Sequence, residues 1–241
     1  MLHRSLAVPE TLTLSSLEKL ESDLEQALSD PTSRVWVLEG EGTAFCRGMD
    51  LGSAFSGQGD IGAALRRFAG CLSRIRRSPR PTMAVVLGAA LGGGVGLAAA
   101  CDLVIASQDA TFGLPEALFG LLPGAVMPVL LERMPPQKAR LLALSGVTRR
   151  AEWAQAHGLV DEVVPSADLP RGIERSAREL GRVWPRSVSA LRGWLCELTQ
   201  LAPDAALARG AGVTAGLARD EAVREAVRAF IEEGAVRWEG R

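Results

Sequence analysis

One uncharged, glycine-rich stretch constrains the fold of this chain more than any other feature. From Pro81 to Cys101 the sequence PTMAVVLGAALGGGVGLAAAC has no charged residue, and Gly92 to Gly94 are consecutive glycines. The length would suit a membrane-spanning helix. However, the run is mostly alanine and glycine, prolines stand at its start, and Val85, Val86 and Gly88 resemble the end of a buried strand. We therefore expect a strand, a glycine turn and a helix instead of a membrane span.

The composition is that of an ordinary soluble chain and excludes several classes of function. The 241 residues suffice for one large domain or for one domain with an appendage, and the net charge of −1 favours neither nucleic acid nor an anionic membrane as a partner. Aromatic residues make up only 5% and tyrosine is absent, which argues against base stacking. The four cysteines form no CxxC pair, so we expect free thiols in a reducing cytoplasm and no metal site. The N-terminal sequence lacks a continuous apolar core and a small-residue cleavage site, so we expect no signal peptide.

Hydrophobic periodicity divides the chain into an α/β part and a helical end. Leucines at helical spacing follow Ser15 and Glu18, which have the spacing of a capping box, and Asp50 stands where it could cap a short helix. The other expected elements are strands at 34–40, 82–88, 102–107 and 160–165, a helix at 61–77 with a basic end, and a long helix or helix pair at about 204–233. This order predicts an α/β fold whose last part is helical.

Two further interpretations of the glycine-rich stretch involve a negatively charged group. Gly94, Gly96 and Ala99 match the GxGxxA pattern of dinucleotide-binding loops, but the loop is long and no acidic residue clearly closes a second strand to hold a ribose. Alternatively, glycines that enter a helix leave backbone N–H groups free to stabilise an oxygen that becomes negative during a reaction. The loop TAFCRGMD, Thr43 to Asp50, is a candidate for a second such donor.

A candidate acid or base lies in the segment FGLPEALFGLLPG. Apolar residues surround Glu116 there, and burial among them would raise the pKa of its carboxyl toward the range useful for proton transfer. The alternative is a carboxylate that follows Pro115 and only stabilises a helix N-terminus. The remaining polar candidates have structural interpretations: Asp50 as a cap, His157 at a helix end and Cys46 in the core. No Ser-His-Asp arrangement indicates a hydrolase.

Several motifs in this order resemble those of the crotonase, or enoyl-CoA hydratase/isomerase, superfamily. They are EGTAFCRGMDL, PRPTMAVVLGAALGGGVGLAAACDLVIASQDATFGLPEALFGLLPG, GLVDEVVP and the closing AVRAFIEEGAVRWEGR, and the similarity extends from about Ser15 to Arg241. The resemblance implies an α/β spiral of ββα units over residues 1–185. It also implies a C-terminal helical region over 186–241 that builds homotrimers, often paired as hexamers. The substrate would be a CoA or phosphopantetheine thioester, with no other cofactor.

The resemblance also implies roles for individual residues. The oxyanion hole of the family would consist here of the backbone N–H groups of Met49 and Gly93, and one of the two hydratase glutamates falls at Glu116. The other falls at Gly96 and is missing. One carboxyl can still serve a double-bond shift or the elimination of a hydroxyl group. The expected substrate pocket comprises Phe45, Gly92, Gly94, Gly96, Pro115, Leu122 and Gly124.

Two of these motifs narrow the resemblance further. FCRGMDL and LPEALFGLLPG are similar to motifs of the crotonase-like dehydratases of polyketide β-branching, which convert 3-hydroxy-3-methylglutaryl groups on an acyl carrier protein to 3-methylglutaconyl groups. We therefore expect such a dehydratase. A Δ3,Δ2-enoyl-CoA isomerase, which also needs one glutamate, is the alternative. A catalytically silent scaffold that binds an acyl carrier is an alternative of another class, favoured by the missing carboxylate and opposed by Glu116.

The chain lacks two features that often accompany CoA binding in this superfamily. Its N-terminus is short and has no strand pair and turn that would contact the nucleotide, and no lysine follows Phe230 in the closing helix. Both departures fit a phosphopantetheine donor on an acidic carrier protein. Six arginines could meet such a carrier or could form a solvated helix face: Arg66, Arg67, Arg74, Arg76, Arg77 and Arg80.

Overall fold

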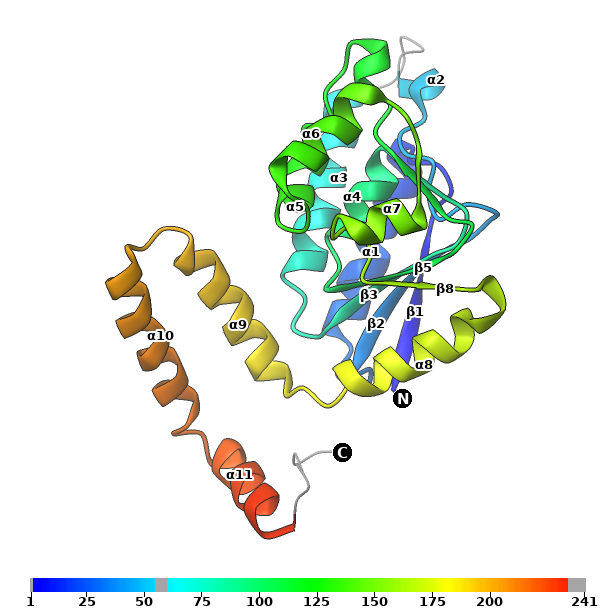
Figure 1. The fold of residues 1–241 in the computed structure, drawn as a ribbon. Helices are drawn as coiled ribbons and strands as arrows, with labels where there is room; N and C mark the ends of the chain where they lie inside the picture. Colours follow the sequence, from blue (N-terminus) through cyan, green and yellow to red (C-terminus); the bar gives the residue numbers. More distant parts are fainter. Residues whose placement is uncertain (1, 55–59, 234–241) are drawn as a thin grey trace. The chain divides into compact units, whose positions relative to one another are not determined.

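The computed structural model describes residues 2–54 and 60–233 (Figure 1). Contacts within the chain divide it into two compact units, Met1–Arg182 and Val183–Arg241. The described part of the first unit contains two β-sheets with their helices, and the described part of the second contains helices. The predicted class, an α/β fold with a helical end, is confirmed. The family-based division into residues 1–185 and 186–241 stays a prediction.

The first unit is built around a parallel sheet of five strands. In spatial order these are β1 (His3–Val8), β2 (Val35–Gly40), β3 (Thr82–Val86), β5 (Leu103–Ser107) and β8 (Glu162–Val164). Every neighbouring pair is parallel, so each connection must cross from one end of the sheet to the other. Helices α1 (Leu14–Ser29) and α3 (Ile61–Arg76) make the first two of these crossings.

Alternating side chains of the strands supply two separate hydrophobic cores. Val37 and Met83 belong to a small cluster on the face that α8 (Leu169–Leu180) covers, as the yellow helix along the sheet in Figure 1 shows. Leu38 and Ala84, the next residues in sequence, belong to the main core that includes buried residues of α1 and α3. Side chains of a strand point alternately to opposite faces, so the sheet separates these two cores.

The glycine-rich stretch folds into three elements of the first unit. It forms strand β3, then β4 (Ala89–Leu91), and then helix α4 (Gly93–Ala99), whose residues from Gly94 onward are buried. A second sheet joins β4 to β6 (Thr111–Gly113) and β6 to β7 (Arg149–Arg150). None of the helices in the described ranges has the length and apolar character needed to cross a bilayer.

The expected helices and strands occur close to their predicted positions, with one correction at the first helix. Its capping box is formed by Thr13 and Ser16, whose side chains each accept the backbone N–H of the other, and not by Ser15 and Glu18. Helix α3 begins as expected, because the Asp60 side chain accepts the N–H of Ala63 at 2.8 Å.

Several short elements were not predicted. Strand β1 lies at an edge of the sheet and buries only Leu6 and Val8. Its sequence HRSLAV therefore shows too little alternation of apolar and polar residues to predict a strand. Strands β4, β6 and β7 have two or three residues each, too few for a periodic signal. The remaining elements of this unit are α2 (Leu51–Ala54), η1 (Glu116–Phe119), α5 (Val126–Leu131), α6 (Pro136–Ser145), α7 (Ala151–Ala156) and η2 (Ser166–Asp168).

The second unit contains three successive helices within its described residues. These are α9 (Pro185–Leu198), α10 (Pro203–Leu217) and α11 (Glu221–Glu233). Prolines occupy the first positions of α9 and α10, where their missing N–H costs nothing. The region expected to be a long helix or a helix pair is therefore a pair, α10 and α11, separated by a break at residues 218–220.

Candidate active site

A mainly apolar cavity of about 240 Å³ lies at the N-terminus of α4. Among its lining residues, only Arg47 and Glu116 carry charged side chains. Its walls come from the loop before α2, from α3, from the turn before α4 and from the segment between η1 and α5. Seven of the residues predicted for the site line it: Met49, Gly92, Gly93, Pro115, Glu116, Leu122 and Gly124.

Two glycine turns meet at this cavity, as their separate motifs suggested. Backbone hydrogen bonds join them: the N–H of Cys46 donates to the Ala89 carbonyl at 3.1 Å, and the N–H of Leu91 donates to the Cys46 carbonyl at 2.8 Å. Gly48 has φ +84°, and a Cβ there would lie 2.8 Å from the Leu91 carbonyl oxygen and 3.3 Å from the nitrogen of Gly93. Only glycine meets both the backbone conformation and the close approach.

Each turn contributes one N–H group that has no acceptor among the residues that the structure describes. The strand-like pairing of Leu12 with Met49 uses the carbonyl of Gly48 and the N–H of Asp50, and leaves the Met49 N–H unused. Gly93 is the first residue of α4, so its N–H has no partner inside the helix. Among the described residues neither group donates a hydrogen bond. Two such donors are what a negatively charged oxygen requires, and this role of Met49 and Gly93 stays a prediction.

Glu116 is half-buried at the start of the 3₁₀ helix η1. Burial raises the pKa of its carboxyl, and a hydrogen bond from its own backbone N–H partly opposes this. Its Oε2 atom is buried and, within the described part of the chain, has no hydrogen-bond partner. A Cβ on Gly92 would lie 3.1 Å from Oε1, so the carboxyl rests against the glycine turn. A carboxyl of raised pKa, with one unpartnered oxygen and two N–H donors in the same cavity lining, has the properties of a general base or acid.

The place of a second carboxyl is filled by apolar side chains. A Cβ on Gly96 would lie 3.1 Å from the Cζ of Phe68 and 3.1 Å from Cγ2 of Val126, and both of these residues line the cavity. The cavity wall here therefore consists of a phenylalanine and a valine. Glu116 is the only carboxyl among the residues that line the cavity.

Three residues expected in the substrate pocket do not line this cavity. Phe45 is fully buried in the main core, and Gly96 lies behind Phe68 and Val126. Gly94 is also buried, because its missing side chain lets α4 pack directly on the carbonyl of Cys46. These glycines serve close packing of the helix instead of contact with the cavity.

Part of the cavity lining was not predicted from the sequence. Those residues are Arg47, Gly48, Leu51, Leu65, Phe68, Phe119, Pro123, Ala125 and Val126. Leu65 and Phe68 belong to the apolar face of α3, whose periodicity indicates burial but not that part of the face borders a cavity. Arg47 is adjacent to the glycine of the first turn, and that position is the one signal that could have identified it.

The other polar candidates lie outside the cavity lining. Burial raises the pKa of the Cys46 thiol to about 11, so it is inert as a nucleophile. His157 stacks on Trp153 with ring centroids 4.3 Å apart, and its Nδ1 lies 2.8 Å from the Trp153 carbonyl oxygen. Asp50 directly precedes α2, as expected of a cap. Three or more metal-ligating side chains do not cluster anywhere in the described ranges.

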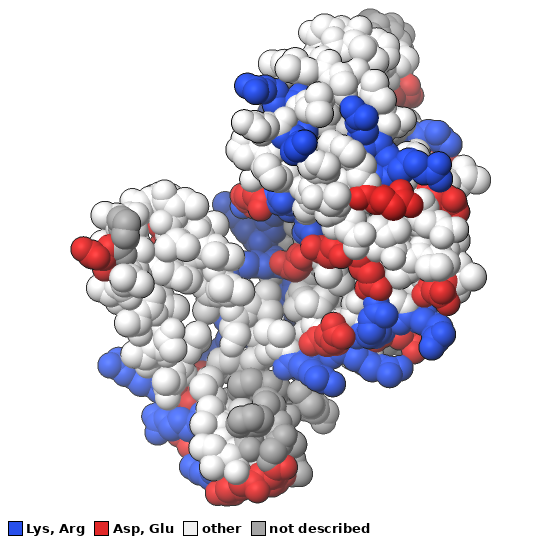
Figure 2. Space-filling model, in the orientation of Figure 1, with Lys and Arg blue, Asp and Glu red and all other residues white. Residues whose placement is uncertain are grey.

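The arginines suggested as a carrier-protein surface are largely paired within the chain. Arg67 contacts Glu18 at 3.2 Å and Glu21 at 2.6 Å, and Arg74 contacts Glu21 at 2.8 Å. Arg76 pairs with Glu132. On the face of the first unit that Figure 2 shows, acidic and basic side chains lie next to one another. These pairs leave α3 with much less free positive charge than its sequence indicates.

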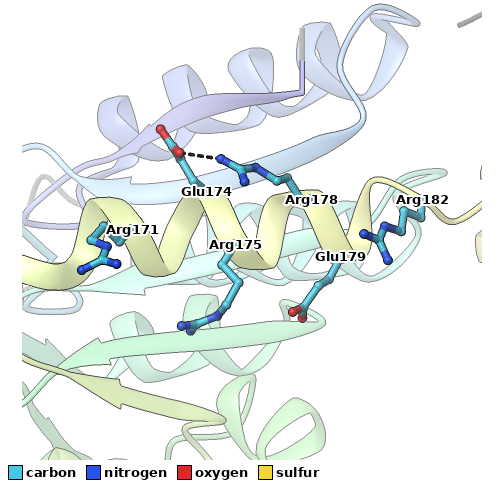
Figure 3. A pocket seen from close by; sticks show the side chains of 6 residues that line it. All are labelled: Arg171, Glu174, Arg175, Arg178, Glu179 and Arg182. Carbon is cyan, nitrogen blue, oxygen red and sulfur yellow. Dashed lines mark hydrogen bonds and ion pairs between the residues drawn. The ribbon is translucent and has the colours of Figure 1, made fainter.

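A second hollow, of about 290 Å³, runs along α8 and has a different character. Figure 3 shows that five of its labelled side chains come from this helix, that Arg182 follows the helix end, and that Arg178 donates a hydrogen bond to Glu174, at 3.0 Å. Arg175 pairs with Glu162 of β8. Its lining consists only of arginine and glutamate side chains. It is a charged helix face and lacks the apolar walls of a thioester site.

Comparison with known proteins agrees with this architecture. Residues 5–241 match the family model described as enoyl-CoA hydratase/isomerase. The chain is 32% identical to the 2,3-dehydroadipyl-CoA hydratase of Escherichia coli, covering 98% of this chain and 92% of that protein. It is 33% identical to the mevalonyl-coenzyme A hydratase sidH of Aspergillus fumigatus, with 87% and 79% covered.

A solved structure shares the fold over almost the whole chain. The human enoyl coenzyme A hydratase domain-containing protein 3 superposes with a TM-score of 0.90 at 25% identity, covering 98% of this chain and 96% of that one. The family model, the relatives and this structural likeness lead to one conclusion. The chain belongs to the enoyl-CoA hydratase/isomerase family, the crotonase superfamily.

Proposed function

We propose that this enzyme dehydrates a 3-hydroxyacyl thioester through a thioester enolate. The observation that carries the proposal is the carboxyl of Glu116, the only one in the cavity lining, whose Oε2 has no hydrogen-bond partner in the described part of the chain. The N–H groups of Met49 and Gly93 belong to the same lining, and Phe68 and Val126 fill the space where a second carboxyl would stand. Elimination of a hydroxyl group requires that a proton is removed from C2 and that a proton is given to the leaving oxygen, and one carboxyl can do both in turn.

The reaction follows from these groups in two steps. The carboxylate of Glu116 removes a proton from C2, and the C–H electron pair shifts so that negative charge develops on the thioester oxygen. The N–H groups of Met49 and Gly93 hold that oxygen. The enolate then re-forms the carbonyl, the C2–C3 double bond forms and the C3–O bond breaks. Protonated Glu116, or a water that it orients, gives a proton to the leaving hydroxyl, so water departs and the carboxylate is restored.

Each group has an expected share in the rate. One oxyanion donor contributes roughly 10²–10³-fold in comparable sites, and a positioned general base contributes roughly 10²–10⁴-fold. The raised pKa of Glu116 suits both of its tasks, because a higher pKa makes the carboxylate a stronger base while the protonated carboxyl remains a competent acid.

The proposed substrate is a 3-hydroxy-3-methylglutaryl group on an acyl carrier protein, which would give 3-methylglutaconyl-carrier protein in polyketide β-branching. Support comes from the FCRGMDL and LPEALFGLLPG motifs and from the relative named mevalonyl-coenzyme A hydratase. A mevalonyl group likewise bears a methyl and a hydroxyl on C3. The apolar walls of the cavity suit a branched acyl chain.

The same single carboxyl would also serve a Δ3,Δ2-enoyl-CoA isomerase, which moves a proton from C2 to C4 without losing a group. Incubation with 3-hydroxy-3-methylglutaryl-carrier protein and, separately, with a straight-chain 3-enoyl-CoA distinguishes the two reactions. The proposal predicts loss of water from the first substrate, visible in the mass of the acyl group. A shifted double bond in the second substrate, with the first left intact, would instead identify an isomerase. Binding without either change would identify a scaffold.

We further propose that the enzyme is a homotrimer, or a pair of trimers, in the cytoplasm. The helical unit supports assembly, because large apolar side chains on its helices are exposed in the single chain: 56% for Leu191, 74% for Leu207 and 76% for Ile231. Apolar surface of this kind is normally covered by another protein surface.

A further inference from the structure

Arg47 introduces the one positive charge among the residues that line the cavity. Its side chain is about half-exposed, and its Nε donates to Oε1 of Glu10 at 2.9 Å. Its backbone N–H donates to the Glu10 carbonyl at 2.7 Å, so main chain and side chain are both tied to the same residue. The two terminal guanidinium nitrogens have no partner among the described residues.

We propose that the terminal nitrogens of Arg47 bind an anionic group of the thioester substrate, and that Arg47 thereby determines specificity for charged thioesters. This inference rests on the proposed function, because it concerns the same cavity. A guanidinium that is fixed at Nε presents its other two nitrogens as a fork, which matches two oxygens of a carboxylate or a phosphate. Apart from the N–H groups of Met49 and Gly93, which the proposed reaction uses for the thioester oxygen, the rest of the lining offers such a group only apolar side chains, backbone and the acid Glu116.

Glu10 positions Arg47 and at the same time weakens its charge. Oε1 of Glu10 accepts from Arg47 Nε, with Thr43 Oγ1 at 3.5 Å from it, and the carboxyl packs against Gly42, where a Cβ would collide with it. Replacement of Glu10 by glutamine keeps an acceptor oxygen of the same shape but removes the negative charge. An anionic substrate should therefore bind more tightly to Glu10→Gln, whereas a neutral substrate should bind as before.

Two parts of a substrate could supply the anion. One is the phosphate of the phosphopantetheine arm, and the other is the distal carboxylate of a dicarboxylic acyl group. Four thioesters separate them: 3-hydroxy-3-methylglutaryl and 3-hydroxy-3-methylbutyryl groups, each on phosphopantetheine and on pantetheine. The last combination, 3-hydroxy-3-methylbutyryl-pantetheine, carries neither anion.

The test compares the wild type with Arg47→Gln on all four thioesters. We expect KM to rise about 10- to 100-fold for thioesters that carry the contacted anion, with kcat nearly unchanged, since a charge-assisted contact away from the reacting atoms is uniform binding. KM for the doubly neutral thioester should stay the same. Arg47→Lys should recover part of the loss, because it keeps the charge without the fork.

The pattern of losses identifies the anion. A rise for both phosphopantetheine thioesters assigns the contact to the phosphate, and a rise for both glutaryl thioesters assigns it to the carboxylate. Equal changes for all four, or no change for any, would overturn the proposal. Arg178→Gln is the matched control. Arg178 is an exposed arginine on α8 that forms an ion pair with Glu174 and lies outside the cavity lining, and its replacement changes the net charge by the same amount as Arg47→Gln.

Binding separates this proposal from the proposed function. Dissociation constants measured by calorimetry in the Glu116→Gln background report on Arg47 without any turnover. If the wild type dehydrates none of the thioesters but Arg47→Gln still weakens binding of the charged ones selectively, the reaction has been assigned wrongly and the anion contact stands. If the wild type dehydrates them and binding is insensitive to Arg47, the anion contact is wrong and the reaction stands. Thermal unfolding curves confirm that each variant is folded.

Discussion

At the scale of single residues, the account depends on Glu116 and on the glycine turn beside it. We expect Glu116→Gln to lower kcat about 10²- to 10⁴-fold, because the amide has the size of the carboxyl but cannot take the C2 proton. Steady-state kinetics with a 3-hydroxyacyl thioester provide the measurement. The protein should remain folded with its oligomeric state unchanged. Turnover close to that of the wild type would remove Glu116 from the mechanism.

The raised pKa of Glu116 makes a prediction about the pH dependence of the reaction. The base must be ionised, so kcat/KM should fall as the pH falls through the pKa of Glu116. Because burial raises this pKa, the midpoint should lie above the ordinary glutamate value of about 4.3. A profile that stays flat down to that value would contradict burial as the cause.

The same pKa also affects folding stability. A carboxyl whose pKa is raised in the folded protein stabilises the fold below its ordinary pKa, and this contribution is lost as the pH rises through the raised pKa. Glutamine resembles the protonated form at every pH. Glu116→Gln should therefore melt at a higher temperature than the wild type at neutral pH, and the difference should shrink toward pH 4 or so. Melting curves across this range provide the check, and a variant less stable at neutral pH would refute it.

Gly48 allows the two glycine turns to approach each other closely. Gly48→Ala places a side chain at φ +84° and 2.8 Å from the Leu91 carbonyl oxygen. We expect a loss of stability of about 1–3 kcal/mol from the backbone conformation alone, together with a large drop in kcat as the N–H groups of Met49 and Gly93 separate. Gly120→Ala is a useful control, because Gly120 also has positive φ but meets no atom within 4 Å. It should lose stability without a comparable loss of kcat.

At the scale of elements, the close packing of helix α4 leaves no room for a second carboxyl in the cavity wall. Gly96→Glu should not produce a better hydratase, because its Cβ would press on Phe68 and Val126. Overpacking of this kind costs about 1–3 kcal/mol, and Tm should fall accordingly. Phe68→Ala combined with Gly96→Glu should recover part of the loss from overpacking. If Gly96→Glu alone were as stable as the wild type, the apolar filling of this position would be wrong.

Some secondary-structure elements of this chain were predictable from the sequence, and others were not. The amphipathic helices α1 and α3 carry strong periodic signals, and strands β2, β3 and β5 are short apolar runs between turn residues, so all five were predicted. Edge strand β1 and the short strands of the second sheet were missed, because their pairing depends on distant partners. The cap of α1 shifted from Ser15 to Thr13 because both are good capping residues, and only the path of the preceding chain distinguishes them.

The candidate site was predictable to a similar extent. The motifs identified Glu116 and the two turns, because glycine and proline patterns are local. They could not indicate that Gly94 and Gly96 face the core, that Phe68 and Val126 fill the wall, or that Arg47 reaches the cavity. Those facts depend on which helices pack together. Likewise, the sequence alone could not show that the arginines of α3 are paired, whereas in the structure Glu21 of α1 contacts two of them, Arg67 and Arg74.

At the scale of the whole molecule, the exposed apolar side chains of the helical unit predict assembly. Analytical ultracentrifugation at micromolar concentration should give the mass of a trimer or a hexamer. Replacing exposed Leu207 and Ile231 with arginine should shift the mass toward smaller species, since charges in an apolar interface are costly. A wild-type protein that remains monomeric at all concentrations would contradict this prediction.

The most direct test of the central claim, that one carboxyl and two N–H groups carry out a dehydration, is mass spectrometry of the acyl group. The purified enzyme is incubated with 3-hydroxy-3-methylglutaryl-carrier protein, with Glu116→Gln as the matched control. The account predicts loss of one water from the acyl group with the wild type and almost none with the variant. An acyl group of unchanged mass with the wild type, or equal loss of water with both proteins, would contradict it.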